Sequence, residues 1–119
     1  MNLFYSNISD ITKKNSYFRG VLATTIHMQL VVMSIQTETG TEIHPHTTQF
    51  ITIEAGNGIA IINNHSYTLH SGISLIIPPN TYHNIINTDS QPLKIYTIYS
   101  PPHHRSDRLD INNPHDDIT

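Results

Sequence analysis

The residues of this chain best suited to chemistry are histidines and one glutamate in two separate segments. The first segment carries Glu42, His44 and His46, followed by Gln49, and the second carries His83. Imidazole nitrogens and a carboxylate are ligands that suit Zn, Fe, Mn or Ni. Because a few ligands from two segments leave part of the coordination sphere open, such a set is typical of a reactive metal site. The pattern predicts one divalent transition metal between the two segments.

The first segment presents its ligand candidates together if it is extended. Alternate residues of a strand point to the same side, so Glu42, His44 and His46 share one face of a regular strand. Gln49 is an odd number of residues away from them, so in a regular strand it would point to the opposite face. A bulge or bend after Pro45 would bring Gln49 to the same interior, and proline is a residue that interrupts regular pairing.

The rest of the chain resolves into short strands that could position these segments. Strand-favouring isoleucine recurs throughout, and turn residues such as Asn63-Asn64 separate the runs. We find no convincing helical periodicity. The spacing predicts an all-β antiparallel sandwich or barrel. The expected strands cover residues 17–24, 28–36, 42–46, 49–55, 59–63, 66–70, 73–78, 83–87 and 93–99.

The second histidine segment follows a known motif, G-x5-P-x-G-x2-H-x3-N. It matches at Gly72, Pro78, His83 and Asn87. The glycine that follows the proline in the motif is replaced here by Asn80. That change is mild, because asparagine tolerates a left-handed turn position. In these residues the chain resembles the cupin superfamily. The resemblance implies a single-domain cupin jelly-roll β-barrel built as an antiparallel double sheet.

The first cupin motif fits with substitutions. Counting back from Gly56, Gln49 takes the place of the usual glutamate, His44 that of the second histidine and Glu42 that of the first. The resemblance implies a metal held by Glu42, His44, Gln49 and His83. Gln49 could instead orient an imidazole by a hydrogen bond. The additional His46 could be a replacement ligand, a residue at the barrel mouth or a general acid/base.

The resemblance extends beyond the motifs over roughly residues 17–104. In that span the chain is similar to small single-domain cupins called mannose-6-phosphate isomerase-like. We therefore expect a lead-in at residues 1–16, a cupin domain at 17–104 and a polar tail at 105–119. The label is weak evidence for isomerase activity, because one fold hosts many chemistries.

Other polar residues could line the same interior. Gln29 lies in an apolar run and needs a partner inside the barrel, or else faces a dimer contact. Tyr96 and Tyr99 alternate faces, so one of them points inward. We take His46 and Tyr96 as candidate catalytic residues. The pair His103-His104 reads as solvated.

The composition of the chain limits the chemistry and the binding partners that we expect. The chain has 119 residues, no cysteine, six Lys plus Arg and a formal net charge of −3. Thiolate chemistry is excluded, and nucleic acid is not an expected partner. Without an evident signal peptide or membrane span, we expect a cytoplasmic protein. The apolar strands at 17–36 would need cover, which favours a homodimer.

Three functions suit such a protein. The first is a metalloenzyme for a small polar or sugar-like molecule, of isomerase, epimerase, dioxygenase or hydrolase type. The second is a binding or sensing module that uses the same pocket without chemistry. The third is a storage or structural jelly roll that binds metal only incidentally.

Overall fold

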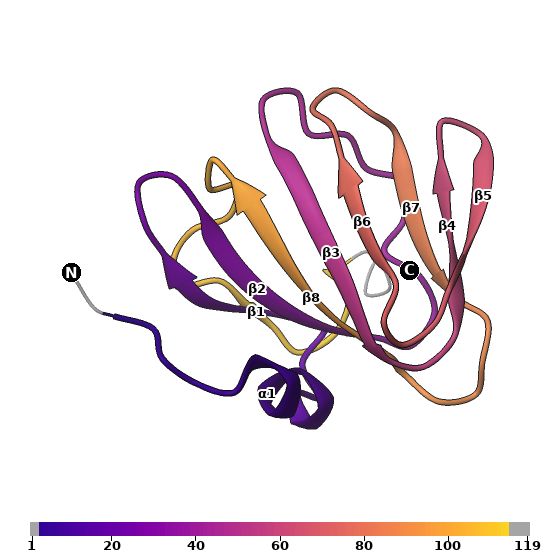
Figure 1. Ribbon diagram of the computed structural model, residues 1–119, viewed down its shortest axis with the longest axis horizontal. Coiled ribbons are helices and arrows are strands. Elements are labelled where there is room, and N and C mark those ends of the chain that lie inside the picture. The colour runs from indigo at the N-terminus through magenta and orange to yellow at the C-terminus, as the bar shows by residue number, and fades with distance from the viewer. Residues whose placement is uncertain (1–2, 115–119) are drawn as a thin grey trace.

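The computed structural model describes residues 3–114 and contains two antiparallel sheets that face each other (Figure 1). The larger sheet has six strands in the order β6-β3-β8-β2-β1-β9, and the smaller has the order β5-β4-β7. This arrangement confirms the predicted single-domain jelly roll. The strands are β1 (Arg19–Thr24), β2 (Gln29–Ile35), β3 (Thr48–Ala55), β4 (Gly58–Ile62), β5 (His65–Leu69), β6 (Ser74–Ile77), β7 (His83–Asn87), β8 (Leu93–Ser100) and β9 (Leu109–Asp110).

The prediction of a strand at residues 42–46 is wrong. Glu42 makes a single bridge to His83, and a turn follows at Pro45 and His46. Proline cannot donate to a sheet ladder, which explains why pairing stops there. This turn is a bend of the kind that would bring Gln49 to the interior, and Gln49 is buried. The other expected strands are present, with bounds shifted by two residues or fewer.

The structure adds one helix that we did not expect, α1 (Ile8–Lys14). The side chain of Asn7 caps it by accepting from the backbone N–H of Asp10. Seven residues are too few for a clear hydrophobic period, so only the cap signalled this helix. The helix lies on the outer face of the large sheet, where the Ser9 hydroxyl donates to Glu54 at 2.7 Å (Figure 1).

Part of the expected tail belongs to the fold. β9 pairs with β1 through Arg19 opposite Asp110 and Gly20 opposite Leu109. β1 is therefore paired on both sides along that stretch, and the free apolar edge expected at residues 17–36 is partly covered. Residues 1–2 of the lead-in and 115–119 of the tail lie outside the described residues.

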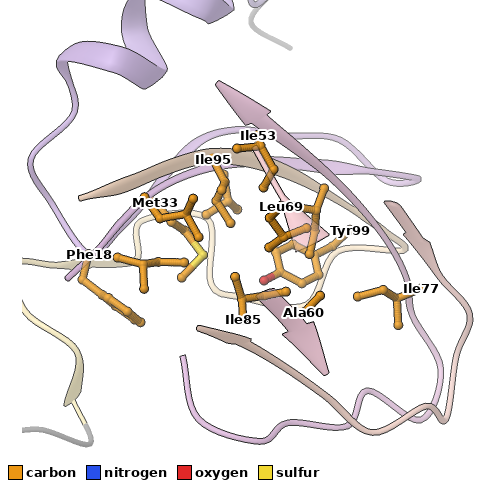
Figure 2. Packing of buried hydrophobic residues seen from close by; sticks show 13 residues of the cluster. Phe18, Met33, Ile53, Ala60, Leu69, Ile77, Ile85, Ile95 and Tyr99 are labelled. Atoms are coloured by element: carbon orange, nitrogen blue, oxygen red, sulfur yellow. The ribbon is translucent and has the colours of Figure 1, made fainter. Parts of the chain in front are cut away.

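The inward-facing residues of the large sheet form rows whose polarity changes along the strands. Gln29, Tyr99 and Gln49 lie side by side in β2, β8 and β3, and all three are buried. We call the end of the barrel that contains this row the polar end. Beyond a mixed row the sheet becomes wholly apolar, and residues of the small sheet complete the core at this apolar end (Figure 2). The apolar inward residues include Val31, Met33, Ile35, Ile51, Ile53, Leu93, Ile95, Ala60, Leu69 and Ile85.

No helix within residues 3–114 has the length and apolarity needed to cross a membrane.

Candidate metal centre

The two histidine segments are joined directly by backbone hydrogen bonds at the polar end. The N–H of Glu42 donates to the carbonyl of His83 at 2.8 Å, and the N–H of His83 donates back to Glu42 at 2.9 Å. The N–H of Asn80 donates to the carbonyl of His44 at 2.8 Å. Asn80 has the left-handed φ of 60° that its place in the motif predicted. These contacts bring the His44 and His83 rings to a centroid separation of 5.0 Å.

His83 is oriented as a metal-ligating histidine would be. Its ring is buried, and Nδ1 lies 2.9 Å from the carbonyl oxygen of Thr81. Because a carbonyl only accepts, Nδ1 carries the proton in this contact and Nε2 keeps its lone pair. A backbone carbonyl that fixes the tautomer in this way is a usual partner of a ligand histidine.

His44 is buried with neither ring nitrogen hydrogen-bonded to any residue in the described part of the chain. Its pKa is lowered from the ordinary value of 6.5 to about 4, first by burial and then by unfavourable Coulomb interactions of a protonated ring with His103, His83 and Arg19. The ring is therefore neutral near pH 7 and offers a lone pair. A buried neutral imidazole without a partner is costly, and a bound ion would satisfy it.

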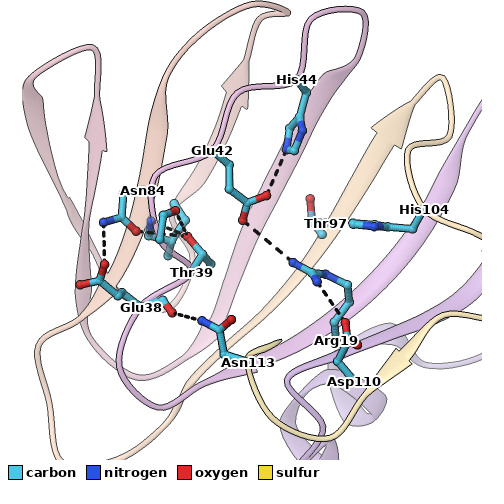
Figure 3. A network of polar contacts seen from close by, with 12 residues as sticks. Arg19, Glu38, Thr39, Glu42, His44, Asn84, Thr97, His104, Asp110 and Asn113 are labelled. Atoms are coloured by element: carbon cyan, nitrogen blue, oxygen red, sulfur yellow. Dashed lines mark hydrogen bonds and ion pairs between the residues drawn. The ribbon is translucent and has the colours of Figure 1, made fainter. Parts of the chain in front are cut away.

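Glu42 lies between the His44 ring and a buried arginine (Figure 3). One carboxylate oxygen is 3.7 Å from Nε2 of His44, and the other is 4.0 Å from the guanidinium of Arg19. Arg19 in turn pairs with Asp110 at 3.1 Å. Because His44 is neutral, its contact with Glu42 is not an ion pair near pH 7. The carboxylate of Glu42 therefore lies beside the His44 ring as a further oxygen donor.

Gln49 faces the interior by the regular alternation of β3. Its amide nitrogen donates to the hydroxyls of Thr97 at 3.0 Å and Tyr99 at 3.3 Å. The amide oxygen is buried and has no hydrogen-bond partner within residues 3–114. Either role expected for Gln49, a weak oxygen ligand or a support for other groups, is compatible with this placement.

The structure corrects the choice between the two tyrosines. Tyr96 lies on the outer face of β8, where its ring is 6.5 Å from that of Phe50. Tyr99 points inward, with its ring 5.7 Å from His44, and burial raises its pKa above the usual range. The strand alternation allowed one inward tyrosine, and we selected the wrong one. His46 is exposed and makes no hydrogen bond or ring contact within the described chain, so its catalytic role stays a prediction.

Sequence reasoning missed the contribution of the segment after β8. The His103 ring lies 4.1 Å from His44 and 4.7 Å from His104, and His104 lies 5.1 Å from Tyr99. The expectation of a solvated pair is wrong for His104, which is half-buried, because the chain turns back towards the polar end after Pro102. His103 is exposed as expected, but its ring also contacts that of His44. A signal was present in Gln29, whose polar side chain in an apolar strand required a partner inside.

The donor set fits a divalent transition metal in chemical type. The imidazoles of His44 and His83, the carboxylate of Glu42 and the amide oxygen of Gln49 lie at the same end of the barrel. Within residues 3–114, however, no group of three or more His, Asp or Glu side chains is already arranged to hold an ion. Binding would therefore require the side chains to rotate towards a common point.

Comparison with known proteins places this fold in a family. The family model for the cupin domain matches residues 29–99. The chain belongs to the cupin family. This cupin is 40% identical over 109 residues to Uncharacterized protein YrkC of Bacillus subtilis, with 85% of this chain and 59% of YrkC covered. The chain thus spans less than two thirds of that relative. It is also 39% identical over 118 residues to Uncharacterized protein L612 of Acanthamoeba polyphaga mimivirus, covering 94% of this chain and 74% of the relative.

Solved structures show the same architecture. The cupin superposes on BH2720 from Bacillus halodurans with a TM-score of 0.91 and 37% identity, covering 94% of this chain and 91% of that one. It superposes on KdgF from Halomonas sp. with a TM-score of 0.65 and 17% identity, covering 71% and 78% of the two chains. The second likeness supports the fold alone.

Proposed function

We propose that this cupin binds a divalent transition metal at the polar end of its barrel and acts there on a small polar or sugar-like molecule. The observation that carries the proposal is the pairing of His44 and His83. Their rings lie 5.0 Å apart, the segments are hydrogen-bonded to each other, and both imidazoles are buried. Glu42 and the amide oxygen of Gln49 are the further ligand candidates.

The electrostatics of the polar end support binding near neutral pH. A metal needs deprotonated ligands, and a histidine with a pKa of about 4 loses no proton on binding at pH 7. The carboxylate of Glu42 lies 3.7 Å from Nε2 of His44, and its other oxygen lies 4.0 Å from the guanidinium of Arg19. Burial at the end of the barrel keeps the effective dielectric constant low, which strengthens each contact with an ion.

The reaction we favour is isomerisation or epimerisation, with dioxygenation as the other enzymatic type. A bound metal of this class polarises a carbonyl or hydroxyl group of a substrate. Tyr99 remains protonated, because burial raises its pKa, and its hydroxyl can hold a substrate oxygen by donating a hydrogen bond. The proposal of a sugar-like substrate comes from the sequence resemblance of residues 17–104 to mannose-6-phosphate isomerase-like cupins. We further propose that the protein is cytoplasmic and acts as a homodimer.

The second candidate is a metal-dependent binding or sensing module without turnover. One observation favours it. A general acid or base works best with a pKa near the working pH, yet the pKa is about 4 for His44 and about 3 for His104. Neither residue exchanges a proton readily near pH 7.

The deciding experiment measures metal content and turnover together. Protein purified without an affinity tag or added metal is analysed by mass spectrometry of its metals, then assayed with a panel of sugar phosphates and oxo-acids. We expect stoichiometric metal in the wild type and little in His83→Ala. Turnover that disappears in His83→Ala supports the enzyme. Metal-dependent ligand binding without turnover supports the sensing module, and a metal-free wild type that takes up none contradicts both.

A further inference from the structure

The segment that follows β8 is held at the polar end by one buried side chain. Gln29 in β2 has no exposed surface. Its amide oxygen accepts from the backbone N–H groups of His104 at 2.9 Å and His103 at 3.3 Å. Its amide nitrogen donates to the carbonyl of His104 at 2.8 Å and to the hydroxyl of Thr24 at 3.0 Å. The whole hydrogen-bonding capacity of the amide is used, mostly on the backbone of these two residues.

A second contact fixes the start of the same segment. The Thr47 hydroxyl donates to the carbonyl of Pro101 at 3.3 Å, which joins this segment to the loop that carries His44. As a result, the rings of His103 and His44 approach within 4.1 Å, closer than those of His44 and His83 at 5.0 Å. The third imidazole at this end therefore comes from outside both cupin motifs.

The two histidines of the segment are not equivalent. The guanidinium of Arg108 lies 3.4 Å from Nδ1 of His104. An arginine can only donate, so Nδ1 of His104 accepts and its Nε2 carries the proton. His104 then has no free lone pair. The ring nitrogens of His103 have no hydrogen-bond partner within residues 3–114, so His103 can offer one to a ligand.

We propose that His103 is a third imidazole ligand of the ion held by His44 and His83, and that Gln29 positions it by anchoring its backbone. The inference rests on the proposed metal site. It supplies a strong nitrogen donor where Gln49 replaces the usual glutamate of the motif and offers only a neutral amide oxygen. Gln29 itself does not touch the ion and acts through the backbone of His103.

The test compares zinc affinity and imidazole count in four variants. His103→Ala removes the ligand, and Gln29→Met removes the anchor at nearly constant volume. His44→Ala tests the underlying site. His65→Ala is the matched control, because His65 is an exposed histidine of β5 to which no ligand or catalytic role is assigned. Zn²⁺ binding is measured by calorimetry, and bound imidazoles are counted by pulsed electron paramagnetic resonance with Cu²⁺ as the probe.

We expect His103→Ala to weaken Zn²⁺ binding by about 100-fold and to lose one bound imidazole. Gln29→Met should weaken binding by about 10-fold, in the range known for residues that orient ligands, and lower the imidazole count although His103 is still present. A purely structural role for Gln29 would not change that count. His65→Ala should match the wild type.

The outcomes separate this inference from the proposed function. If the wild type binds Zn²⁺ and His44→Ala does not, but His103→Ala binds with unchanged affinity and imidazole count, only the role of His103 is overturned. If the wild type binds no Zn²⁺, both proposals are overturned. Should Gln29→Met fail to fold, His103→Ala still decides the role of the ligand, because an exposed side chain can be shortened without disturbing the core.

Discussion

The two ends of the barrel are built on the same strands with opposite chemistry. At the apolar end β2, β3 and β8 bury Met33, Ile53 and Ile95 against the small sheet (Figure 2). At the polar end the same strands bury Gln29, Gln49 and Tyr99 beside His44 and His83. Both ring nitrogens of His44 and the amide oxygen of Gln49 have no hydrogen-bond partner in the described chain.

This difference separates the residues that stabilise the fold from the residues that we expect to bind a ligand. Burying apolar side chains is favourable, whereas a buried polar atom without a hydrogen bond costs stability. A barrel shaped by stability alone would continue its apolar rows to both ends. The polar end departs from that rule, which is expected at a functional site. Substitutions there should change ligand binding, and substitutions at the apolar end should change stability.

The largest expected effect is on metal binding. His44→Ala or His83→Ala should weaken Zn²⁺ binding by more than about 100-fold, since even residues that only orient ligands are worth 10–100-fold. Calorimetric titration of the untagged protein measures this effect. His65→Ala, an exposed histidine of β5, is the control and should bind as the wild type does. Equal affinities in all four proteins would remove the distinction between the two ends.

The apolar end should respond in stability instead. Ile95→Ala is expected to lower the free energy of unfolding by about 2–5 kcal/mol, because it leaves a cavity in the core. Zn²⁺ affinity of the folded variant should be unchanged. Ile76→Ala is the matched control, since Ile76 is 70% exposed and its loss should cost under about 0.5 kcal/mol. Urea unfolding measures both, and a large loss of Zn²⁺ affinity in Ile95→Ala would contradict the separation.

Acid should destabilise the metal-free protein through the polar end. In the folded state the pKa of His44 is about 4, and in the unfolded chain it returns to about 6.5. As pH falls between these values the unfolded chain takes up a proton that the folded protein refuses, so unfolding is favoured. The stability lost is about 1.4 kcal/mol for each unit of pKa shift.

His104, with a pKa of about 3, extends this loss in the same direction to lower pH. Urea unfolding at several pH values between 7 and 4 measures the trend. His44→Gln should show a smaller slope over the same interval. A wild-type stability that is constant or rises as pH falls would contradict the prediction.

The smallest expected effect distinguishes the two tyrosines. Tyr99→Phe removes a hydroxyl that accepts from Gln49 and should cost about 0.5–1.5 kcal/mol in unfolding free energy. Tyr96→Phe should change little, because Tyr96 lies on the outer face. Thermal unfolding of the two variants side by side checks this, and a larger loss for Tyr96→Phe would reverse the assignment of faces.

The parts that followed from the sequence are those set by local pattern. Alternating isoleucines gave the strands, and the motif spacing at Gly72, Pro78 and His83 gave the jelly roll. The left-handed turn at Asn80 also followed, because few residues other than glycine adopt that backbone.

The parts that did not follow depend on contacts between distant segments. His103 reaches the polar end only because Gln29, far away in sequence, binds its backbone. β9 has only two residues and forms by pairing with β1, which is distant in sequence. The seven residues of α1 are too few to show a helical hydrophobic period. The alternation of β8 requires Tyr96 and Tyr99 to point to opposite faces, but only the pairing of β8 with its neighbours decides which of them points inward.

The central claim is that the His44 and His83 imidazoles bind one metal ion. The most direct measurement is anomalous X-ray diffraction, at the zinc absorption edge, from crystals of untagged protein grown with Zn²⁺. We predict an anomalous peak about 2.0–2.1 Å from a ring nitrogen of each histidine. A peak elsewhere, or two rings that face away from any shared ion, would contradict the account.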